Sequence, residues 1–514
     1  MPERKRVAVL ADSDTRWKWG ALTARRLVPD HQLTGYLLRG RATPTARQLG
    51  EVGVRADRLS EVTCAQFLAE IERERHDVVV LALVGGAVQA VLHGARALWP
   101  NPAKRPVFVT GYVGVVYEKL ADGLLLRHGA DLVLANSRHD AERFRAVYEG
   151  VGADAGAVTE TALPFLGGAP YEPAGSRAHT VVFAVQPSVP DSRADRAYLL
   201  ERAAAHARLH PDREVLIKLR SKPGEHTTHL EEQPYQRLAE KLPGGLPANC
   251  RLVYGNMGEV LDGTDLLVTV SSTAALESLH RSIPTAILTD LGIRETLGNH
   301  HFLGSGCLAS WDQLDSGLLP EGDPLWLAAQ GVRPGPAAAA RPSAESVGAA
   351  LPSADPAAAA RPSAESAGSA GSSADPAAAA RSSDDPAAAA RPSAESVGAA
   401  SVGAARSPAE PAAGVAHDAY AVARAKVAGL VAATRLPALA PYYTLTTAPR
   451  YLPGILARHH LAPDGTPLPG AVRPTAGESR LRRRLRAHLR EAARGAYRHG
   501  VQRVAPVIRR LGEL

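Results

Sequence analysis

Three consecutive hydroxyl side chains are well suited to bind an anion. Ser271, Ser272 and Thr273 stand between an aliphatic run, 266–270, and a stretch of good helix formers. A helix that begins here would offer free backbone N–H groups, the positive end of its dipole and hydroxyls to a phosphate. Glu277 follows about one turn later, where its carboxylate could reach a ribose hydroxyl. Plain helix capping is the alternative, because Ser and Thr are common N-cap residues.

Lys218 and Arg220 supply the cations, at the end of another predicted strand. Carboxyl ends of parallel strands lie at one edge of a sheet, so these side chains should converge with 271–273. Two cations and a helix start favour a dianion, such as the diphosphate of a nucleotide sugar or the phosphate of a CMP-sugar. His229, in the loop that follows, could hydrogen-bond a phosphate or base, and an exposed loop histidine is the alternative.

Carboxylates follow the first predicted strand of the chain. Asp14 or Asp12 could remove a proton from an acceptor hydroxyl, although one of them could simply cap the next helix. Lys18 and Trp19 come soon after and could contact an anionic or sugar acceptor. The loop after a later strand adds three candidates to the acceptor side: Gly111, Tyr112 and Gly114.

Buried aliphatic runs alternate with helical patterns, which predicts parallel, doubly wound sheets. In residues 1–168 the predicted strands are 6–11, 32–38, 77–83, 106–110 and 131–135. After a linker, 169–178, the alternation restarts over 179–330, with strands at 180–185, 214–219, 250–254, 266–270 and 285–289. We therefore expect an α/β fold of two Rossmann-like domains that face a cleft, a preferred place for a ligand.

The absence of several known motifs disfavours some classes of enzyme. No GxxxxGK[ST] loop and no GxGxxG after the first strand are present, which disfavours ATPase and dehydrogenase functions. No HExxH, CxxC, GxSxG or suitably placed DxD motif occurs either. We therefore expect no metal and no cofactor beyond a nucleotide-sugar substrate.

The cell compartment is predicted from cysteines and hydropathy. Cys64, Cys250 and Cys307 are isolated, which fits a reducing compartment. The first apolar run is too short for a signal peptide, and no stretch is long enough to cross a bilayer. The sequence thus predicts a cytoplasmic protein.

Composition changes abruptly after the second predicted domain. Residues 331–413 repeat the unit DPAAAARPSAES, for example at 355–366 and 385–396, and we expect this segment to be disordered. Residues 414–470 contain a predicted closing helix and a turn-rich segment. The Arg-rich tail, 471–514, has an amphipathic helical pattern over 480–514 that is typical of binding to an anionic membrane surface. Nucleic acid is not expected as a partner, because no stacking aromatic set accompanies the charge.

The second half of the chain resembles a known family. Residues 264–285, TDLLVTVSSTAALESLHRSIPT, are similar to the pattern SDxxxxxSSxxxEAxxxGxP of the donor-binding half of GT-B glycosyltransferases, but lack its Gly. The strand end from Lys218 to Arg220 resembles the K-x-H-P strand end of capsule, polysialic-acid and glycerophosphate transferases, with Arg220 in place of His. Residues 1–325 as a whole resemble an uncharacterised actinobacterial group of glycosyltransferases.

The resemblance implies a metal-independent GT-B enzyme that moves a sugar from a UDP- or CMP-linked donor to a cell-envelope glycan or lipid-linked acceptor. The second domain would hold the donor, the first would hold the acceptor with Asp14 or Asp12 as base, and the tail would keep the enzyme at the inner face of the membrane. A nucleotide-sugar 2-epimerase and a CDP-polyol phosphotransferase are alternatives with the same fold. A non-catalytic, membrane-associated protein of envelope assembly is an alternative from another class.

Overall fold

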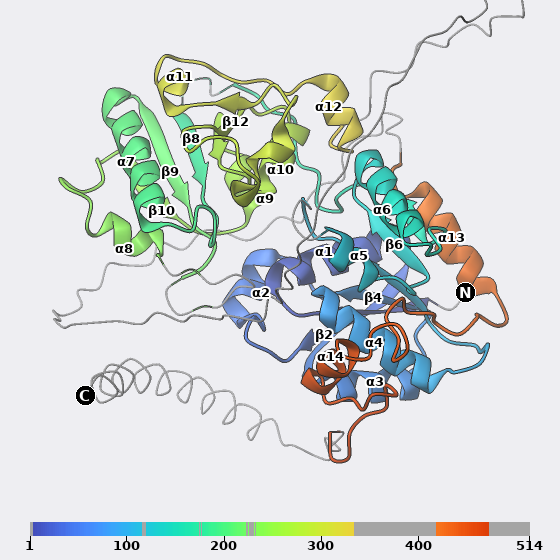
Figure 1. The fold of residues 1–514 in the computed structure, drawn as a ribbon. Coiled ribbons are helices and arrows are strands. Elements are labelled where there is room, and N and C mark those ends of the chain that lie inside the picture. The colour runs from blue at the N-terminus through green and yellow to red at the C-terminus, as the bar shows by residue number, and fades with distance from the viewer. Residues whose placement is uncertain are drawn as a thin grey trace, which may run out of the picture. The chain divides into compact units, whose positions relative to one another are not determined.

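The computed structural model of the chain describes residues 4–115, 120–173, 175, 177–222, 225, 231, 233–333 and 418–471. The predictions for His229, for the Ala/Pro/Ser repeat and for the basic tail lie outside these residues. Two parallel sheets with helices around them make up most of the described chain (Figure 1).

The first sheet has seven parallel strands in the order β3-β2-β1-β4-β5-β6-β7. Its strands are β1 (Lys5–Ala11), β2 (His31–Leu38), β3 (Arg58–Val62), β4 (Val78–Ala82), β5 (Val107–Gly111), β6 (Leu132–Ala135) and β7 (Val158–Glu160). The connecting helices are α1 (Asp14–Leu27), α2 (Ala46–Val52), α3 (Cys64–Arg73), α4 (Gly85–Leu98), α5 (Leu120–Leu125) and α6 (Arg138–Gly150). The predicted doubly wound, parallel arrangement is confirmed.

Side chains of β1 show how the first sheet is covered on both faces. Val7 and Val9 belong to one apolar cluster with residues of α1, whereas Ala8 and Leu10 belong to another with residues of α3 and α4. Successive residues of a strand point to opposite faces, so a strand buried on both sides has to be apolar throughout. This requirement explains the unbroken aliphatic runs in the sequence.

The second sheet has six parallel strands in the order β10-β9-β8-β11-β12-β13. Its strands are β8 (His179–Ala184), β9 (Arg213–Lys218), β10 (Cys250–Val253), β11 (Leu266–Thr269), β12 (Thr285–Leu288) and β13 (Leu308–Ala309). The helices are α7 (Arg193–Leu209), α8 (Tyr235–Ala239), α9 (Met257–Leu261), α10 (Ala274–His280), α11 (Trp311–Asp315) and α12 (Pro324–Ala329), with 3₁₀ turns η1 (Glu295–Leu297) and η2 (Asn299–Phe302). Two parallel α/β sheets in one chain are thus the fold that the sequence predicted.

Two helices near the end of the described chain cover the first sheet, not the second. Helix α13 (Ala421–Ala432) places Ala423 and Val427 in the apolar cluster of α1, and α14 (Leu452–Arg458) packs on α4 (Figure 1). The chain therefore returns to its first domain after the second is complete. None of the helices in the described residues combines the length and apolarity that crossing a bilayer requires.

Candidate functional site

A cavity of about 380 Å³ lies where loops at the carboxyl ends of both sheets meet. This volume is within the usual range of small-molecule sites. Its polar lining comes from both halves of the described chain: Asp14, Thr15, Lys18, Gln48 and Glu51 from the first, and Gln186, Ser188, Lys218, Arg220, Asn256, Ser271, Ser272, Thr273 and Glu277 from the second. Carboxylates and cations thus line the same cavity.

Two ion pairs cross this cavity. The Arg220 guanidinium donates to Asp14 Oδ1 at 2.8 Å, and Lys18 Nζ donates to Glu277 Oε2 at 3.3 Å. Because charged hydrogen bonds are strong where water is partly excluded, these pairs tie the first helix of the first domain to the second domain.

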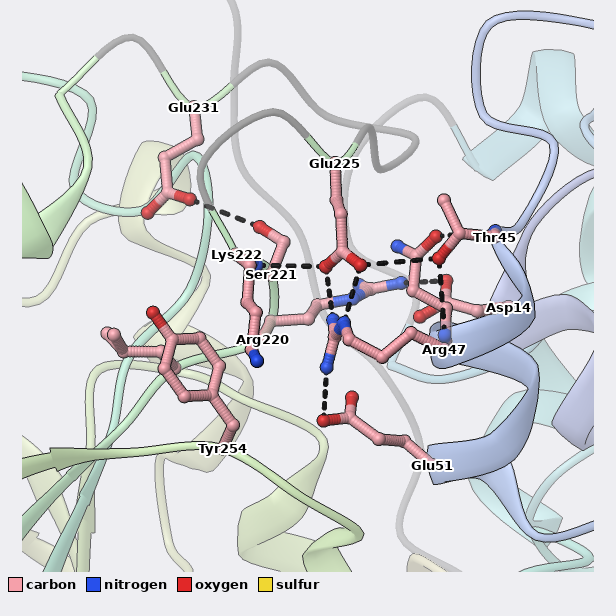
Figure 2. A network of polar contacts seen from close by, with 12 residues as sticks. Asp14, Thr45, Arg47, Glu51, Arg220, Ser221, Lys222, Glu225, Glu231 and Tyr254 are labelled. Atoms are coloured by element: carbon pink, nitrogen blue, oxygen red, sulfur yellow. Dashed lines mark hydrogen bonds and ion pairs between the residues drawn. The ribbon is translucent and has the colours of Figure 1, made fainter. Parts of the chain in front are cut away.

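Further polar contacts join the two domains beside the cavity. Arg47 on α2 pairs with Glu225, and Figure 2 shows this pair next to Arg220 and Asp14. The Asn256 side chain donates to the carbonyl of Glu51 at 2.9 Å. Helix α2 therefore forms part of the cavity wall, although it carries no residue that the sequence analysis selected.

Asp14 begins helix α1, which Ser13 caps by accepting a hydrogen bond from the Arg16 backbone N–H. Burial by itself would raise the pKa of the Asp14 carboxyl, but the Arg220 charge and the hydrogen bonds from Arg220 and Thr15 outweigh burial. The pKa of Asp14 therefore lies below its ordinary value, and the group is a carboxylate at neutral pH. The structure places this predicted base in the cavity.

Asp12, the other predicted base, does not line the cavity. Its two carboxylate oxygens accept hydrogen bonds from the Val84 backbone N–H and the Arg16 guanidinium, both at 2.9 Å. These bonds fix the loop after β1 to the loop after β4. The structure thus gives Asp12 a role in holding the loops, which leaves Asp14 as the better candidate for the base.

Lys218 ends strand β9 and is only 8% exposed. Its Nζ donates to the Leu219 carbonyl at 2.7 Å, and among the described residues no carboxylate lies within ion-pair distance of it. Burial lowers the pKa of this amine to about 8, because a charged group loses hydration in the cavity wall. A bound anion would compensate this cation.

The three hydroxyl residues all line the cavity but differ in their bonds. Ser271 Oγ donates to the Leu297 carbonyl at 2.6 Å and accepts from the Gln186 amide at 3.2 Å, so it holds surrounding loops. Ser272 Oγ accepts from the Ala274 N–H at 3.2 Å, which is the capping alternative. Thr273 makes no side-chain capping bond. The three predicted hydroxyl residues thus lie together on the cavity wall, and the hydroxyl of Ser271 is used in bonds that hold the surrounding loops.

Gly114 is one of three residues that the sequence analysis selected at the end of β5 and in the loop after it, and it lies close to the second domain. A Cβ atom at this position would come within 2.6 Å of Thr273 Oγ1, so only glycine permits this approach. Gly114 also lines the cavity, and its acceptor-side role stays a prediction.

Three other predicted acceptor residues do not line the cavity. Trp19 is buried in the core of the first sheet, and its ring lies against Gly111 on β5. Tyr112 packs on Phe144 and beneath the Arg127 guanidinium. These three residues therefore belong to the packing of the first domain and not to the cavity wall.

Sequence reasoning missed Gln48, Glu51 and Asn256, which line the cavity. Asn256 lies in the short loop after β10, where it caps α9, so the rule that ligands bind at carboxyl ends of strands could have selected it. Gln48 and Glu51 lie within α2, well past β2, and no local pattern distinguishes them from residues of any amphipathic helix.

Three residues within the described part of the chain have ligand atoms close enough together to hold a metal ion: His206 on α7, His210 just after it, and Asp315 on α11. His206 Nδ1 is 2.6 Å from Asp315 Oδ1, and Arg202 also donates to that carboxylate at 2.9 Å. Arginine beside the ligand atoms opposes a cation. We interpret the group as an ionic contact between two helices, and none of its members lines the cavity.

The two parallel sheets and the charged cavity at the carboxyl ends of their strands define a two-domain α/β protein. The family described as "Putative glycosyltransferase (DUF6716)" matches residues 7–347, and the chain belongs to this family. The match confirms the resemblance to glycosyltransferases that the sequence analysis found. No curated protein matches the chain.

Solved structures with a similar fold include epimerases and glycosyltransferases. UDP-N-acetylglucosamine 2-epimerase from Rickettsia bellii is 12% identical, with a TM-score of 0.42 over 62% of this chain and 89% of that one. A UDP-glucosyltransferase from Polygonum tinctorium is 13% identical, with a TM-score of 0.40 over 65% of this chain and 93% of that one. The assignment to a family rests on the sequence match.

Proposed function

We propose that the protein is a glycosyltransferase that binds a nucleotide sugar in the cavity between its two parallel sheets and transfers the sugar to an acceptor hydroxyl. The observation that carries this proposal is the meeting of Asp14 from the first domain with Lys218 and Arg220 from the second around one cavity. A base can take the proton of the acceptor hydroxyl, and two cations can stabilise the charge that develops on the departing phosphate.

The donor would lie on the second domain. Lys218 and Arg220 would contact the phosphates of a UDP- or CMP-linked sugar, with hydroxyls of Ser272 and Thr273 beside them. Glu277 would accept from ribose hydroxyls. These roles are supported by the shared position of the residues on the cavity wall and by the chemistry of their side chains.

In the proposed reaction Asp14 accepts the proton of the acceptor hydroxyl while the acceptor oxygen attacks the anomeric carbon. The bond between that carbon and the donor phosphate oxygen breaks, and its electron pair stays on the departing nucleotide. Lys218 and Arg220 would stabilise this developing charge, which is why we propose that no metal is needed.

A cell-envelope glycan or lipid-linked molecule is the proposed acceptor, and residues 480–514 are the proposed contact with the inner face of the membrane. The amphipathic Arg-rich pattern of the tail supports this proposal. Truncation after Gly477 should release the protein from anionic vesicles in a sedimentation assay. Undiminished binding to the vesicles would contradict it.

The test of the function is a calorimetric titration of the full chain with UDP, GDP, dTDP, CDP and CMP. One nucleotide should bind, and Lys218→Ala and Ser272→Ala should weaken its binding. Lys241→Ala, an exposed lysine of the same domain, is the matched control and should bind as the wild type does. If none of the nucleotides binds, the proposed function is wrong.

A further inference from the structure

The Arg220–Asp14 pair joins two residues with different roles in the proposed reaction: Asp14 accepts a proton and Arg220 binds phosphate. Arg220 Nη2 lies 2.8 Å from Asp14 Oδ1 and also donates to the Thr15 hydroxyl. The Asp14 and Arg220 side chains are 13% and 30% exposed, so water screens the pair only in part. While they are paired, Asp14 Oδ1 and Arg220 Nη2 are bonded to each other, so a substrate that takes either atom has to displace its partner.

The charged groups around the cavity differ in whether they have an ion-pair partner. Lys18 and Glu277 also pair with each other across the cavity, at 3.3 Å. Lys218 instead donates only to a backbone carbonyl among the described residues. A phosphate group can therefore bind Lys218 without breaking an ion pair. Arg220 lies two residues further along the chain.

A diphosphate beside Lys218 would compete with Asp14 for the Arg220 guanidinium. Its charge exceeds that of one carboxylate, and guanidinium groups favour bidentate contacts with phosphate oxygens. A carboxylate that keeps its guanidinium partner is a weak base, because protonation costs it that interaction. Donor binding and release of the base are thus coupled by one side chain.

We propose that the Arg220–Asp14 ion pair is a switch operated by the donor: a diphosphate-bearing ligand draws Arg220 away, and Asp14 becomes free to accept a proton from the acceptor hydroxyl. This inference rests on the proposed function. It predicts that Asp14 is a poor base until the donor is bound. Without the donor, Asp14 would then rarely remove a proton from an acceptor hydroxyl.

Competition for Arg220 has a consequence that binding measurements can detect. Replacing the charged competitor should strengthen nucleotide binding, so Asp14→Asn should bind the nucleotide up to about fivefold more tightly, the fold-change expected for a partly exposed ion pair. The same substitution should abolish turnover. A catalytic carboxylate without the switch would lose turnover at unchanged affinity.

The experiment is a double-mutant cycle on the full chain, with the nucleotide that binds wild type as the probe. Asp14→Asn should tighten binding in the wild-type background and have no effect in the Arg220→Gln background. Asp12→Asn is the matched control for affinity, because Asp12 also pairs with an arginine but not with Arg220. Thr15→Val removes the neutral partner of Arg220 and should also tighten nucleotide binding, but by less than Asp14→Asn does. This variant replaces Asp14→Asn in the test if Asp14→Asn does not fold.

The outcomes separate the two proposals. Nucleotide binding that depends on Lys218 but is unchanged or weakened by Asp14→Asn and Thr15→Val would overturn the switch and leave the proposed function standing. An equal effect of Asp14→Asn in both backgrounds would also overturn the switch. Absence of binding by every nucleotide would overturn both proposals.

Discussion

At the scale of single residues, Lys218 determines how the site should respond to pH. The pKa of its buried amine is lowered to about 8. A bound phosphate favours the charged amine, so binding raises this pKa and requires proton uptake once the pH exceeds about 8. Nucleotide affinity should therefore be nearly constant below pH 7 and fall by up to about tenfold per pH unit well above pH 8.

The measurement is a titration series between pH 6.5 and 9.5 in buffers of different ionisation enthalpy, which reports the protons taken up. Lys218→Arg is the control, because a guanidinium stays charged over this range and should remove the dependence. An affinity that is flat or rises across the series would contradict the assignment of Lys218 to the anion.

Residue positions at strand ends could be predicted from sequence, whereas their pairings could not. The aliphatic runs locate Lys218, Arg220 and Asp14 at carboxyl ends, which meet at one edge of each sheet. The partners Asp14 and Arg220 are 206 residues apart, and no local pattern records that contact. Lys18 and Trp19 are neighbours in sequence, but about 100° apart around the helix, so one reaches the cavity and the other the core.

At the scale of elements, strands with an aliphatic run were predictable, whereas three short or polar edge strands, β3, β7 and β13, were not. Strands β1, β4 and β11 are buried on both faces and therefore read as aliphatic runs. The missed strand β3 is largely exposed, with the sequence RLSEV, and β7 and β13 have only three and two residues. Short or polar edge strands leave no run of the kind by which the sequence analysis recognised strands.

A serine just after helix α10 and its C-cap residue Arg281 has an unusual conformation. Ser282 has φ of 67°, in the left-handed region, where the GT-B pattern quoted above has glycine. The Ile283 N–H bonds to the Ser278 carbonyl around it, as in a helix end that favours glycine. Ser282→Gly should therefore raise the free energy of unfolding by about 0.5–1 kcal/mol, because the strain of a left-handed Cβ is relieved.

Urea unfolding of the full chain measures this change. Ser316→Gly is the control: Ser316 follows helix α11 with φ of −78°, so glycine relieves no strain there, adds freedom to the unfolded chain and removes the exposed hydrogen bond from Ser316 Oγ to the Asp312 carbonyl. A gain in stability at both positions, or at neither, would mean that the conformation of Ser282 does not strain this chain.

At the scale of the whole described chain, residues 418–471 return to the first domain and complete its core. Leu452 and Leu456 on α14 are fully buried in the same apolar cluster as the residues of α4. His93 of α4 also hydrogen-bonds the Tyr443 carbonyl at 2.9 Å, which fixes the approach of this segment. The first sheet is therefore covered in part by residues that follow the second sheet in sequence, so the first domain is not one continuous segment of the chain.

This arrangement makes the first domain's stability depend on a segment far along the chain. Leu456→Ala should lower the free energy of unfolding by about 2–5 kcal/mol, since it removes buried methyl groups and leaves a cavity against α4. Leu445→Ala, at a leucine of the same segment that is 45% exposed, should change it by less than about 0.5 kcal/mol. Urea unfolding of the full chain followed by circular dichroism measures both. Equal stability of the two variants would mean that α14 rests on the first domain without supporting it, and the first domain would then be expected to fold without residues 418–471.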